Sequence, residues 1–303
     1  MNDVSRPGKV LYPANGSFAA QDKGAVIAYY RDIAEYLLPH VKDRFLTLHR
    51  FPDGICEDGF YQQSRQHYFP DSVRGVEAPR ASGGGSVEHI LIDDVEGLVF
   101  LADQGALVLH GWQSRCDRPD RPDRLVFDLD PSDGDFVAVI DAARLLREVL
   151  ELAGLEAFVM TTGSRGLHVV APLERRMGFD AARDLAGQLS DAVVARAPRR
   201  FTRKQRKRAR QGRLYLDIGR NAYGQTAVVP YSLRALPGAP VATPLDWIEL
   251  GRRDLTPRRF RLDNIRRRLA QKADPWRHFF TREARARPDA HDLHAWTEDS
   301  RCV

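Results

Sequence analysis

Three aspartates have the type and the spacing that could carry out chemistry. Asp128 and Asp130 stand two apart in LVFDLD, and Asp217 stands in RLYLDIG. Residues two apart on a strand point to the same face, so the first two carboxylates lie ~7 Å apart at Cα. Such a pair repels itself unless a cation lies between, and Mg²⁺ and Mn²⁺ favour carboxylate oxygens. If Asp217 faces the same patch, the three acids could hold one or two divalent ions for phosphoryl transfer.

This acidic pair has two other interpretations. Acidic pairs near strand ends are often simply solvated. FDLDPS is also similar to the aspartyl-phosphate signature of haloacid-dehalogenase-type phosphatases. Those enzymes need a parallel sheet with alternating helices and a downstream lysine, and the β-hairpin predicted after the first helix argues against them.

A glycine-rich turn follows in TTGSRGLH, residues 161–168. The hydroxyls of Thr162 and Ser164, the guanidinium of Arg165 and the backbone N–H groups are donors that an anionic triphosphate needs. His168 opens the next strand, where it would alternate onto the face that carries Asp128. A turn of this composition is often only a turn, and its place beside the acidic strand favours a ligand site.

The elements that must position these residues follow a regular order. Hydrophobic periodicity predicts, in sequence, strand 125–130, helix 136–154, strands 156–162 and 167–173, helix 179–197 and strand 213–219. This β-α-β-β-α-β order is the split βαβ or ferredoxin-like pattern, with the first strand central between the third and fourth. Further upstream we expect a helix over 23–38 that stops at Pro39, strands at 45–50 and 60–63, and a proline-punctuated loop at 116–124.

Charge is distributed unevenly along the chain. Residues 1–195 hold 20 basic and 30 acidic side chains, whereas residues 196–303 hold 26 and 11. The densest run, 196–213, has ten basic residues and no acid. Lys and Arg contacts to phosphate dominate nucleic-acid affinity, so this half favours a polyanionic partner. With no apolar run of ~18–20 residues and no secretory leader, we expect a cytoplasmic protein and no membrane partner.

The motifs taken together resemble one family. RLVFDLDP, TGSRGLHVVAPL and LYLDIGRNAYGQTAVVPYSLR, preceded by KVLYPANG and KGAVIAYYRDIAEYLLPHV, look like the polymerase domain of bacterial ATP-dependent DNA ligase D. That domain belongs to the archaeo-eukaryotic primase superfamily, and the likeness covers roughly residues 6–270. It implies an α+β fold with an RRM-like or ferredoxin-like primase core and a packed N-terminal α/β module. We expect a single domain over 1–300, divided into the module (1–115), the core (116–270) and a tail (271–303).

The resemblance also implies an activity and the residues that perform it. The family extends primers on DNA templates with Mn²⁺-favoured catalysis at gaps or broken ends, often with ribonucleotides. Two divalent ions, Mn²⁺ or Mg²⁺, and NTP or dNTP substrates are implied. The matching positions are Asp128, Asp130 and Asp217 for metal and catalysis; His110, Thr162, Ser164, Arg165, His168 and Arg234 for the nucleotide; and Arg6, Lys9, Lys23, Phe60, Tyr61 and Gln63 for DNA. Among these, Lys9 and Lys23 match the pair that grips a downstream 5′-phosphate.

Some positions depart from the family pattern. Arg6 stands where the family carries Asn, Gln63 where it carries Lys, and Arg165 where it carries Lys. The chain has no Lys-x-Asp-Gly ligase motif, so we expect no ligase activity of its own; Met1 and the last residues favour a free-standing relative. An end-binding Ku protein and a separate ligase are the implied protein partners. De novo priming, and a non-catalytic nucleic-acid-binding module, are the alternatives; an acidic sheet face speaks against the latter because it repels phosphate.

Overall fold

In the computed structural model, which describes residues 4–81, 83–131 and 134–281, the strand carrying Asp128 lies in the middle of a six-stranded sheet. The strand order is β13-β14-β10-β12-β11-β16. The first strand of the predicted motif, β10, thus lies between the third, β12, and the fourth, β14, as the split βαβ pattern predicts. β10 runs antiparallel to both neighbours, which excludes the parallel sheet of the phosphatase alternative. The bounds are β10 (Arg124–Asp130), β11 (Phe158–Thr161), β12 (Leu167–Pro172), β13 (Phe201–Thr202), β14 (Leu214–Asp217) and β16 (Thr243–Leu245).

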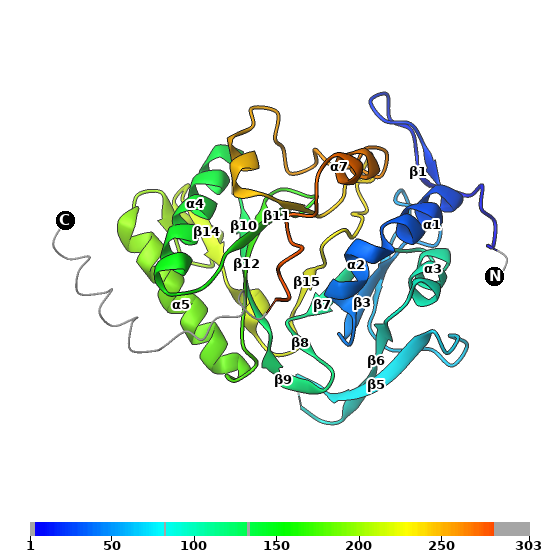
Figure 1. Cartoon of the computed structure of the whole chain (residues 1–303), viewed down its shortest axis with the longest axis horizontal. Helices are drawn as coiled ribbons and strands as arrows, with labels where there is room; N and C mark the ends of the chain where they lie inside the picture. The colour runs from blue at the N-terminus through cyan, green and yellow to red at the C-terminus, as the bar shows by residue number, and fades with distance from the viewer. Residues whose placement is uncertain (1–3, 82, 132–133, 282–303) are drawn as a thin grey trace. The chain divides into compact units, whose positions relative to one another are not determined.

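Two long helices, α4 (Phe136–Leu152) and α5 (Phe179–Arg196), pack on β10 and lie side by side (Figure 1). α4 begins where the Asp135 side chain accepts a hydrogen bond from the Ala138 N–H at 3.1 Å, an N-cap. The alternate residues of β10, Leu125, Phe127 and Leu129, are fully buried. Each such side chain stabilises the fold by roughly 1.5–3 kcal/mol. The opposite face of β10 is left for Asp128 and Asp130.

A second sheet has the order β15-β7-β3-β6-β5, and β4 also pairs with β3. Two-stranded pairs join β1 to β2 and β8 to β9. The bounds of these strands are β1 (Val10–Tyr12), β2 (Gln21–Asp22), β3 (Leu46–Arg50), β4 (Phe60–Gln62), β5 (Val73–Pro79), β6 (Ser86–Ile92), β7 (Ala106–Trp112), β8 (Ser114–Arg115), β9 (Arg118–Pro122) and β15 (Thr226–Val228). The remaining helices are α1 (Lys23–Asp32), α2 (Ala34–Val41), α3 (Val95–Asp103), α6 (Lys207–Arg210), α7 (Ile265–Gln271) and the 3₁₀ turns η1 (Gly219–Asn221) and η2 (Trp247–Gly251).

The chain forms two units, each with its own internal packing. The first comprises Met1–Pro119, Thr226–Thr243 and Arg258–Asp274; the second comprises Asp120–Gln225, Pro244–Pro257 and Pro275–Val303. The expected division into module, core and tail stays a prediction, and the part of the tail after residue 281 lies outside the described residues. Before that point Trp276 is buried and donates from Nε1 to the Val159 carbonyl at 3.1 Å. This part of the tail therefore packs on β11.

The helix predicted over 23–38 is two helices. α1 ends at Asp32 and α2 starts at Ala34, with Ile33 between them. The prediction that Pro39 stops the helix was wrong, because α2 continues through it to Val41. Because a second helix starts at Ala34, Pro39 lies inside this short helix. Its missing N–H removes one hydrogen bond, the one to the Glu35 carbonyl four residues before it.

The loop predicted at 116–124 is also partly wrong. β9 occupies most of it and pairs with β8, although it contains two prolines. A two-stranded ribbon consists of edge strands only, which is where proline is tolerated in a sheet.

No described helix is long and apolar enough to cross a membrane.

Candidate active site

The strand register of the second unit brings reactive side chains into one row. Asp128 on β10 lies directly opposite Asp217 on β14 and directly opposite His168 on β12. Opposite residues on neighbouring strands point to the same face, with Cβ atoms ~4.5–5.5 Å apart. Asp130, two residues along β10, shares that face. We call these four residues the carboxylate row.

Asp128 is the most constrained member of the row. Its side chain is buried, with Oδ1 3.5 Å from His168 Nε2 and Oδ2 3.2 Å from Arg220 Nη2. Burial raises the pKa of the Asp128 carboxyl, but His168 and Arg220 outweigh it and hold that pKa at about 2. Asp128 is therefore a carboxylate anion at neutral pH.

Asp130 and Asp217 are more exposed and have different partners. Arg165 Nη2 donates to Asp130 Oδ2 at 2.9 Å. Burial and the neighbouring charge of Asp128 raise the pKa of Asp130, and Arg165 opposes that rise. Asp217 Oδ1 accepts a hydrogen bond from the Gly219 N–H at 2.7 Å.

The turn between β11 and β12 is closed by one of the predicted nucleotide ligands. The buried Thr162 hydroxyl lies 3.1 Å from the Gly166 carbonyl and 3.3 Å from the N–H groups of Ser164 and Gly166. Gly166 passes so close to β10 that a Cβ there would lie 1.9 Å from the Leu129 carbonyl oxygen. Thr162 thus shapes the turn, whereas the Arg165 side chain remains 64% exposed.

Sequence reasoning missed Arg220 and Asn221, which follow β14. Arg220 contacts Asp128 from η1. Asn221 is 1% exposed: its Oδ1 accepts from the Val126 N–H at 2.8 Å, and its Nδ2 donates to the Val126 carbonyl at 2.7 Å. The amide thus replaces the strand partner that β10 lacks once β14 has ended at Asp217. The sequence signal was their place in the motif LYLDIGRNAYGQTAVVPYSLR, directly after the acidic strand.

The carboxylate row has the donor chemistry of a divalent-cation site. Its three carboxylates are hard oxygen ligands on adjacent strands, which suit Mg²⁺ or Mn²⁺. In the described residues their oxygens face Arg220, His168, Arg165 and a backbone N–H, and no set of three or more His, Cys, Asp or Glu side chains there is gathered tightly enough to hold a metal ion. The residue types and strand positions fit such ions, which would take the place of these basic partners.

A polar cavity of about 460 Å³ opens beside Asp217. It lies between α5, β14 and the start of the basic run, where Arg203 donates to the Gly187 carbonyl at 2.9 Å. Arg210, in the same run, lies over the Tyr215 ring at 4.4 Å. The basic run thus contacts both α5 and β14 next to the row.

The first unit carries an aromatic cluster on β3, β4 and β7. Tyr61 is 64% exposed and stacks on His49 with ring centroids 4.1 Å apart, while His110 lies 6.2 Å from Tyr61. Burial and the nearby charge of Arg234 lower the pKa of His49. Three predicted ligands, Tyr61, His110 and Arg234, thus lie around His49. Phe60, the neighbour of Tyr61 on β4, pairs with Arg50 on the opposite face of the sheet, and that guanidinium lies 5.2 Å from its ring centroid. Gln63 is exposed at the end of β4, and its carbonyl accepts from the Ile90 N–H.

The predicted phosphate ligands Arg6, Lys9 and Lys23 lie near the start of α1. The Lys23 N–H donates to the Lys9 carbonyl at 2.8 Å, and the Lys9 N–H donates to the Arg6 carbonyl at 3.0 Å. Both lysine side chains already have acidic partners: Lys9 contacts Asp53 at 2.5 Å and Lys23 contacts Asp103 at 2.8 Å. The backbone therefore gathers the three cations into one basic cluster.

A sheet with antiparallel central strands, and a carboxylate row beside a donor-rich turn, are typical of the class of metal-dependent nucleotidyltransferases. The comparisons with known proteins agree with this class. The family described as "LigD, primase-polymerase domain" matches residues 22–276. The chain therefore belongs to the LigD primase-polymerase domain family, whose members are DNA-directed nucleotidyltransferases.

Two relatives show how similar this chain is in sequence to other members of the family. The chain is 31% identical over 274 residues to the multifunctional non-homologous end joining protein LigD of Mycolicibacterium smegmatis, covering 89% of this chain and 35% of that protein. It is 30% identical over 275 residues to the bifunctional non-homologous end joining protein LigD of Bacillus subtilis, covering 90% of this chain and 43% of that protein. The chain thus spans less than half the length of these relatives.

A solved structure covers nearly the same extent as this chain. The polymerase domain of Mycobacterium tuberculosis ligase D, determined in complex with DNA, superimposes with a TM-score of 0.83 at 29% sequence identity. The match covers 91% of this chain and 96% of that one. The fold is therefore that of a ligase D polymerase domain, as the sequence motifs predicted.

Proposed function

We propose that this chain adds nucleotides, preferentially ribonucleotides, to primer 3′ ends at DNA gaps or double-strand-break ends during end joining. The observation that supports this most is the register that sets Asp217, Asp128 and His168 side by side across three strands. Phosphoryl transfer asks the protein mainly for positioning and charge neutralisation, which a rigid sheet face supplies.

We assign the roles of the row as follows. Asp128, Asp130 and Asp217 would hold two divalent ions, Mn²⁺ or Mg²⁺. When bound, these ions neutralise charge on the phosphates and promote attack by the primer hydroxyl. Arg165, Ser164 and the N–H groups of the turn bind the triphosphate, and His168 orients it from β12. The cavity beside Asp217 accommodates the primer end.

The first unit recognises the DNA in this proposal. Tyr61 is exposed enough to stack on a template base, which is worth ~1–3 kcal/mol per base, and Phe60 is exposed on the other face of β4. His110 and Arg234 contact the incoming nucleotide. Arg6, Lys9 and Lys23 bind the 5′-phosphate of the downstream strand, and Gln63 contacts the template.

The biological setting follows from the same proposal. The mycobacterial structural relative was solved with DNA, and the full-length relatives are named as end-joining proteins. We infer that this chain acts on the bacterial nucleoid in the cytoplasm, together with a Ku protein that binds ends and with a DNA ligase that seals them.

Single-nucleotide addition on a short-gap duplex tests the proposal. Purified protein is given Mn²⁺ or Mg²⁺ and each ribo- and deoxynucleotide in turn, with and without a 5′-phosphate across the gap. We expect addition that follows the template base, prefers ribonucleotides and increases with the 5′-phosphate. Tight DNA binding with no addition under any condition would instead identify a non-catalytic binding module.

A further inference from the structure

The ammonium group of Lys23 has no hydrogen left to donate. It lies 2.8 Å from Asp103 Oδ1, 2.7 Å from the Ser5 carbonyl and 2.6 Å from the Ser5 hydroxyl. An ammonium has three N–H donors, so these partners use all of them. The side chain of Lys23 is also only 10% exposed. A phosphate can bind Lys23 only by replacing one of these partners.

Asp103 stabilises this closed arrangement from a second side. Its Oδ1 also accepts a hydrogen bond from the Ser5 N–H at 3.0 Å, and the Ser5 hydroxyl lies 3.2 Å from both carboxylate oxygens. Asp103 thus holds Lys23 and the segment that leads to Arg6 together. It is the one anionic group in contact with Lys23 among the described residues, and hence the group that a phosphate, itself an anion, would replace.

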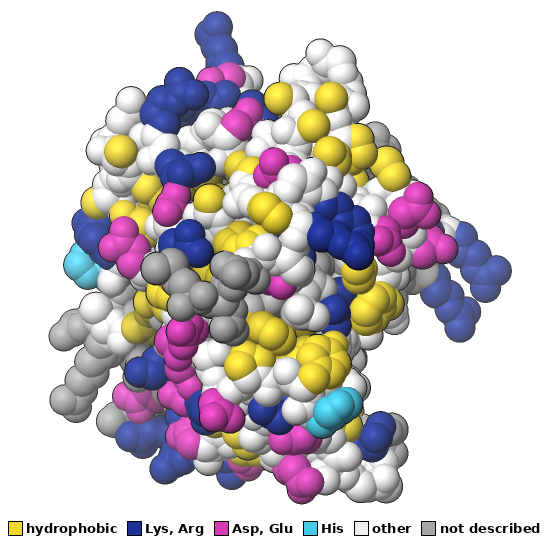
Figure 2. All heavy atoms as spheres, turned by 90° about the vertical axis from the view of Figure 1, so that its right-hand side faces the viewer, with side chains coloured by type: hydrophobic (Ala, Val, Ile, Leu, Met, Phe, Trp, Pro, Cys, Tyr) yellow, Lys and Arg dark blue, Asp and Glu magenta, His cyan; other side chains and the backbone are white. Residues whose placement is uncertain are grey.

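Lys9 shows the same pairing in a more open form. Its ammonium contacts Asp53 at 2.5 Å, and this hydrogen bond holds the pKa of Asp53 below its usual range. The Asp53 side chain is 70% exposed, so water and a ligand can reach it freely. Both lysines of the basic cluster are therefore neutralised by a carboxylate. Lys23 and Asp103 form a largely buried pair, and Lys9 and Asp53 form an exposed one. Acidic and basic side chains also lie close to one another over the face of the molecule that Figure 2 shows.

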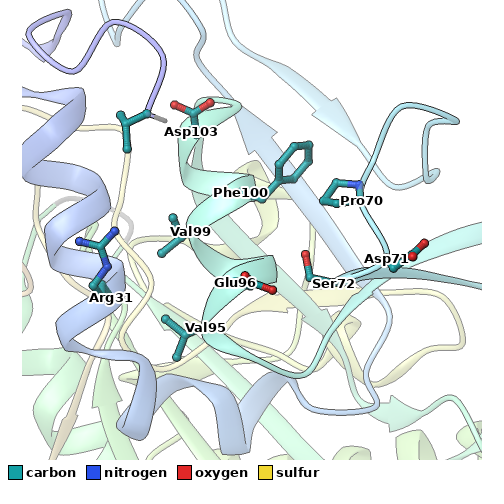
Figure 3. A pocket seen from close by; sticks show the side chains of 10 residues that line it. Arg31, Pro70, Asp71, Ser72, Val95, Glu96, Val99, Phe100 and Asp103 are labelled. Atoms are coloured by element: carbon teal, nitrogen blue, oxygen red, sulfur yellow. The ribbon is translucent and has the colours of Figure 1, made fainter. Parts of the chain in front are cut away.

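Asp103 has space to turn into. It helps to line a cavity of about 390 Å³ between α1 and α3, with Arg31 on the opposite helix (Figure 3). In Figure 3 Asp103 stands at the end of α3, one turn beyond Val99 and Phe100. The lining also includes Arg31, Asp71 and Glu96, so the cavity offers a carboxylate released from Lys23 space but no net positive charge.

We propose that Asp103 and Asp53 make the basic cluster selective for a terminal 5′-phosphate over the internal phosphodiesters of DNA. This inference rests on the proposed 5′-phosphate recognition and adds the residues that set its specificity. An internal phosphodiester carries one negative charge, no more than the carboxylate it would replace. A terminal phosphate carries about −1.5 to −2 at neutral pH, so it alone gains from the exchange.

The test compares binding of two gapped duplexes that differ only in a 5′-phosphate or a 5′-hydroxyl at the gap. Their Kd values are measured by fluorescence anisotropy for the wild type, Asp53→Asn, Asp103→Asn and the double variant. We expect each substitution to tighten binding of the hydroxyl duplex, by ~3- to 10-fold for the double variant, as one or two cations are freed. The preference for the phosphate duplex should fall accordingly, and Asp103→Asn should affect it more than Asp53→Asn.

Two controls make the result decisive. Asp58→Asn removes an exposed carboxylate of the same unit and should leave the preference unchanged. Asp53→Asn alters a surface group, so its result stands even if Asp103→Asn fails to fold. An unchanged or increased preference in the Asn variants overturns the proposal, as does a wild type without preference. Nucleotide addition on a primer-template lacking the downstream strand is measured in parallel, because its loss would count against the polymerase function rather than against the two aspartates.

Discussion

The carboxylate row of the second unit and the basic cluster of the first unit hold their charges in opposite ways. Asp128 is placed by strand register and is buried between His168 and Arg220. Lys9 and Lys23 are instead held by short ion pairs at the start of α1. The carboxylates of the row are placed by the backbone ladder, whereas the ammonium groups of the cluster are held by side-chain carboxylates that a ligand can displace.

This difference matches two different demands. Phosphoryl transfer needs groups that do not reorganise during the reaction, because misplacement by 1 Å can cost about a hundredfold in rate. In our proposal, recognition of a 5′-phosphate by the cluster is an ion exchange that only a more highly charged ligand drives. The most severe substitutions should therefore lie in the row, and the cluster should tolerate changes that alter specificity alone.

Removing the central charge of the row should have the largest effect. We expect Asp128→Asn to lower single-nucleotide addition about a thousandfold or more, since several kcal/mol of charge stabilisation are lost. DNA affinity should change little. Rapid-quench kinetics and anisotropy measure the two quantities, with Asp180→Asn on the exposed face of α5 as the control. If Asp128→Asn adds nucleotides at the wild-type rate, Asp128 has no catalytic role.

The amide that completes the ladder should come next. Asn221→Ala leaves the buried N–H and carbonyl of Val126 without these partners, which we expect to cost about 2–5 kcal/mol of unfolding free energy. Urea unfolding measures this loss. Asn264→Ala is the control. It removes an amide that is hydrogen-bonded to two backbone groups in the first unit, and it should leave nucleotide addition intact. If Asn221→Ala keeps full stability, water must satisfy Val126 and the ladder argument fails.

The close approach of the turn to β10 predicts a smaller effect. Gly166→Ala would place a methyl group 2.6 Å from Asp130 Oδ1 as well as against Leu129, so the turn must shift by about an ångström. We expect a loss of about 1–3 kcal/mol in stability and at least a tenfold rise in the nucleotide KM. Gly178→Ala, with nothing closer than 3.9 Å, is the matched control. Equal behaviour of the two variants would show that the turn need not lie against the strand.

The exposed aromatic cluster should give the smallest change. Tyr61→Ala is expected to weaken template binding about tenfold, from the loss of one stacked base, without altering the unfolding free energy. Tyr61→Phe keeps the ring and should bind like the wild type. A loss that both variants share would assign the effect to the hydroxyl group.

The sequence allowed the second unit to be predicted further than the first. The alternating apolar residues in 125–130, together with the helical periodicity of the segments around them, predicted the strand order and the shared face of Asp128 and Asp130. The strand β13 was hidden because Phe201 is an isolated apolar residue within a basic run. The helix break at Ile33 and the pairing of the proline-containing strand β9 with β8 depend on tertiary contacts, which no local sequence pattern encodes.

The site residues divide in the same way. Motif resemblance selected the positions, and strand register explains why Asp217 and His168 accompany Asp128. The contacts that hold the site residues and their strands in place could not be predicted, because pairs such as Lys23–Asp103 and Val126–Asn221 join segments 80 and 95 residues apart. Thr162 shows this clearly: the motif predicted its hydroxyl as a nucleotide ligand, but not that this hydroxyl also closes the turn onto the Gly166 carbonyl.

Binding of Mn²⁺ itself tests the central claim most directly, because it needs neither substrate nor product. Electron paramagnetic resonance records the loss of the free Mn²⁺ signal during titration of the wild type, Asp128→Asn and Asp217→Asn. The carboxylate row predicts that the wild type binds Mn²⁺ and that each Asn variant loses most of this binding while remaining folded. Equal Mn²⁺ binding by the wild type and both variants would contradict the assignment of the row as the metal site.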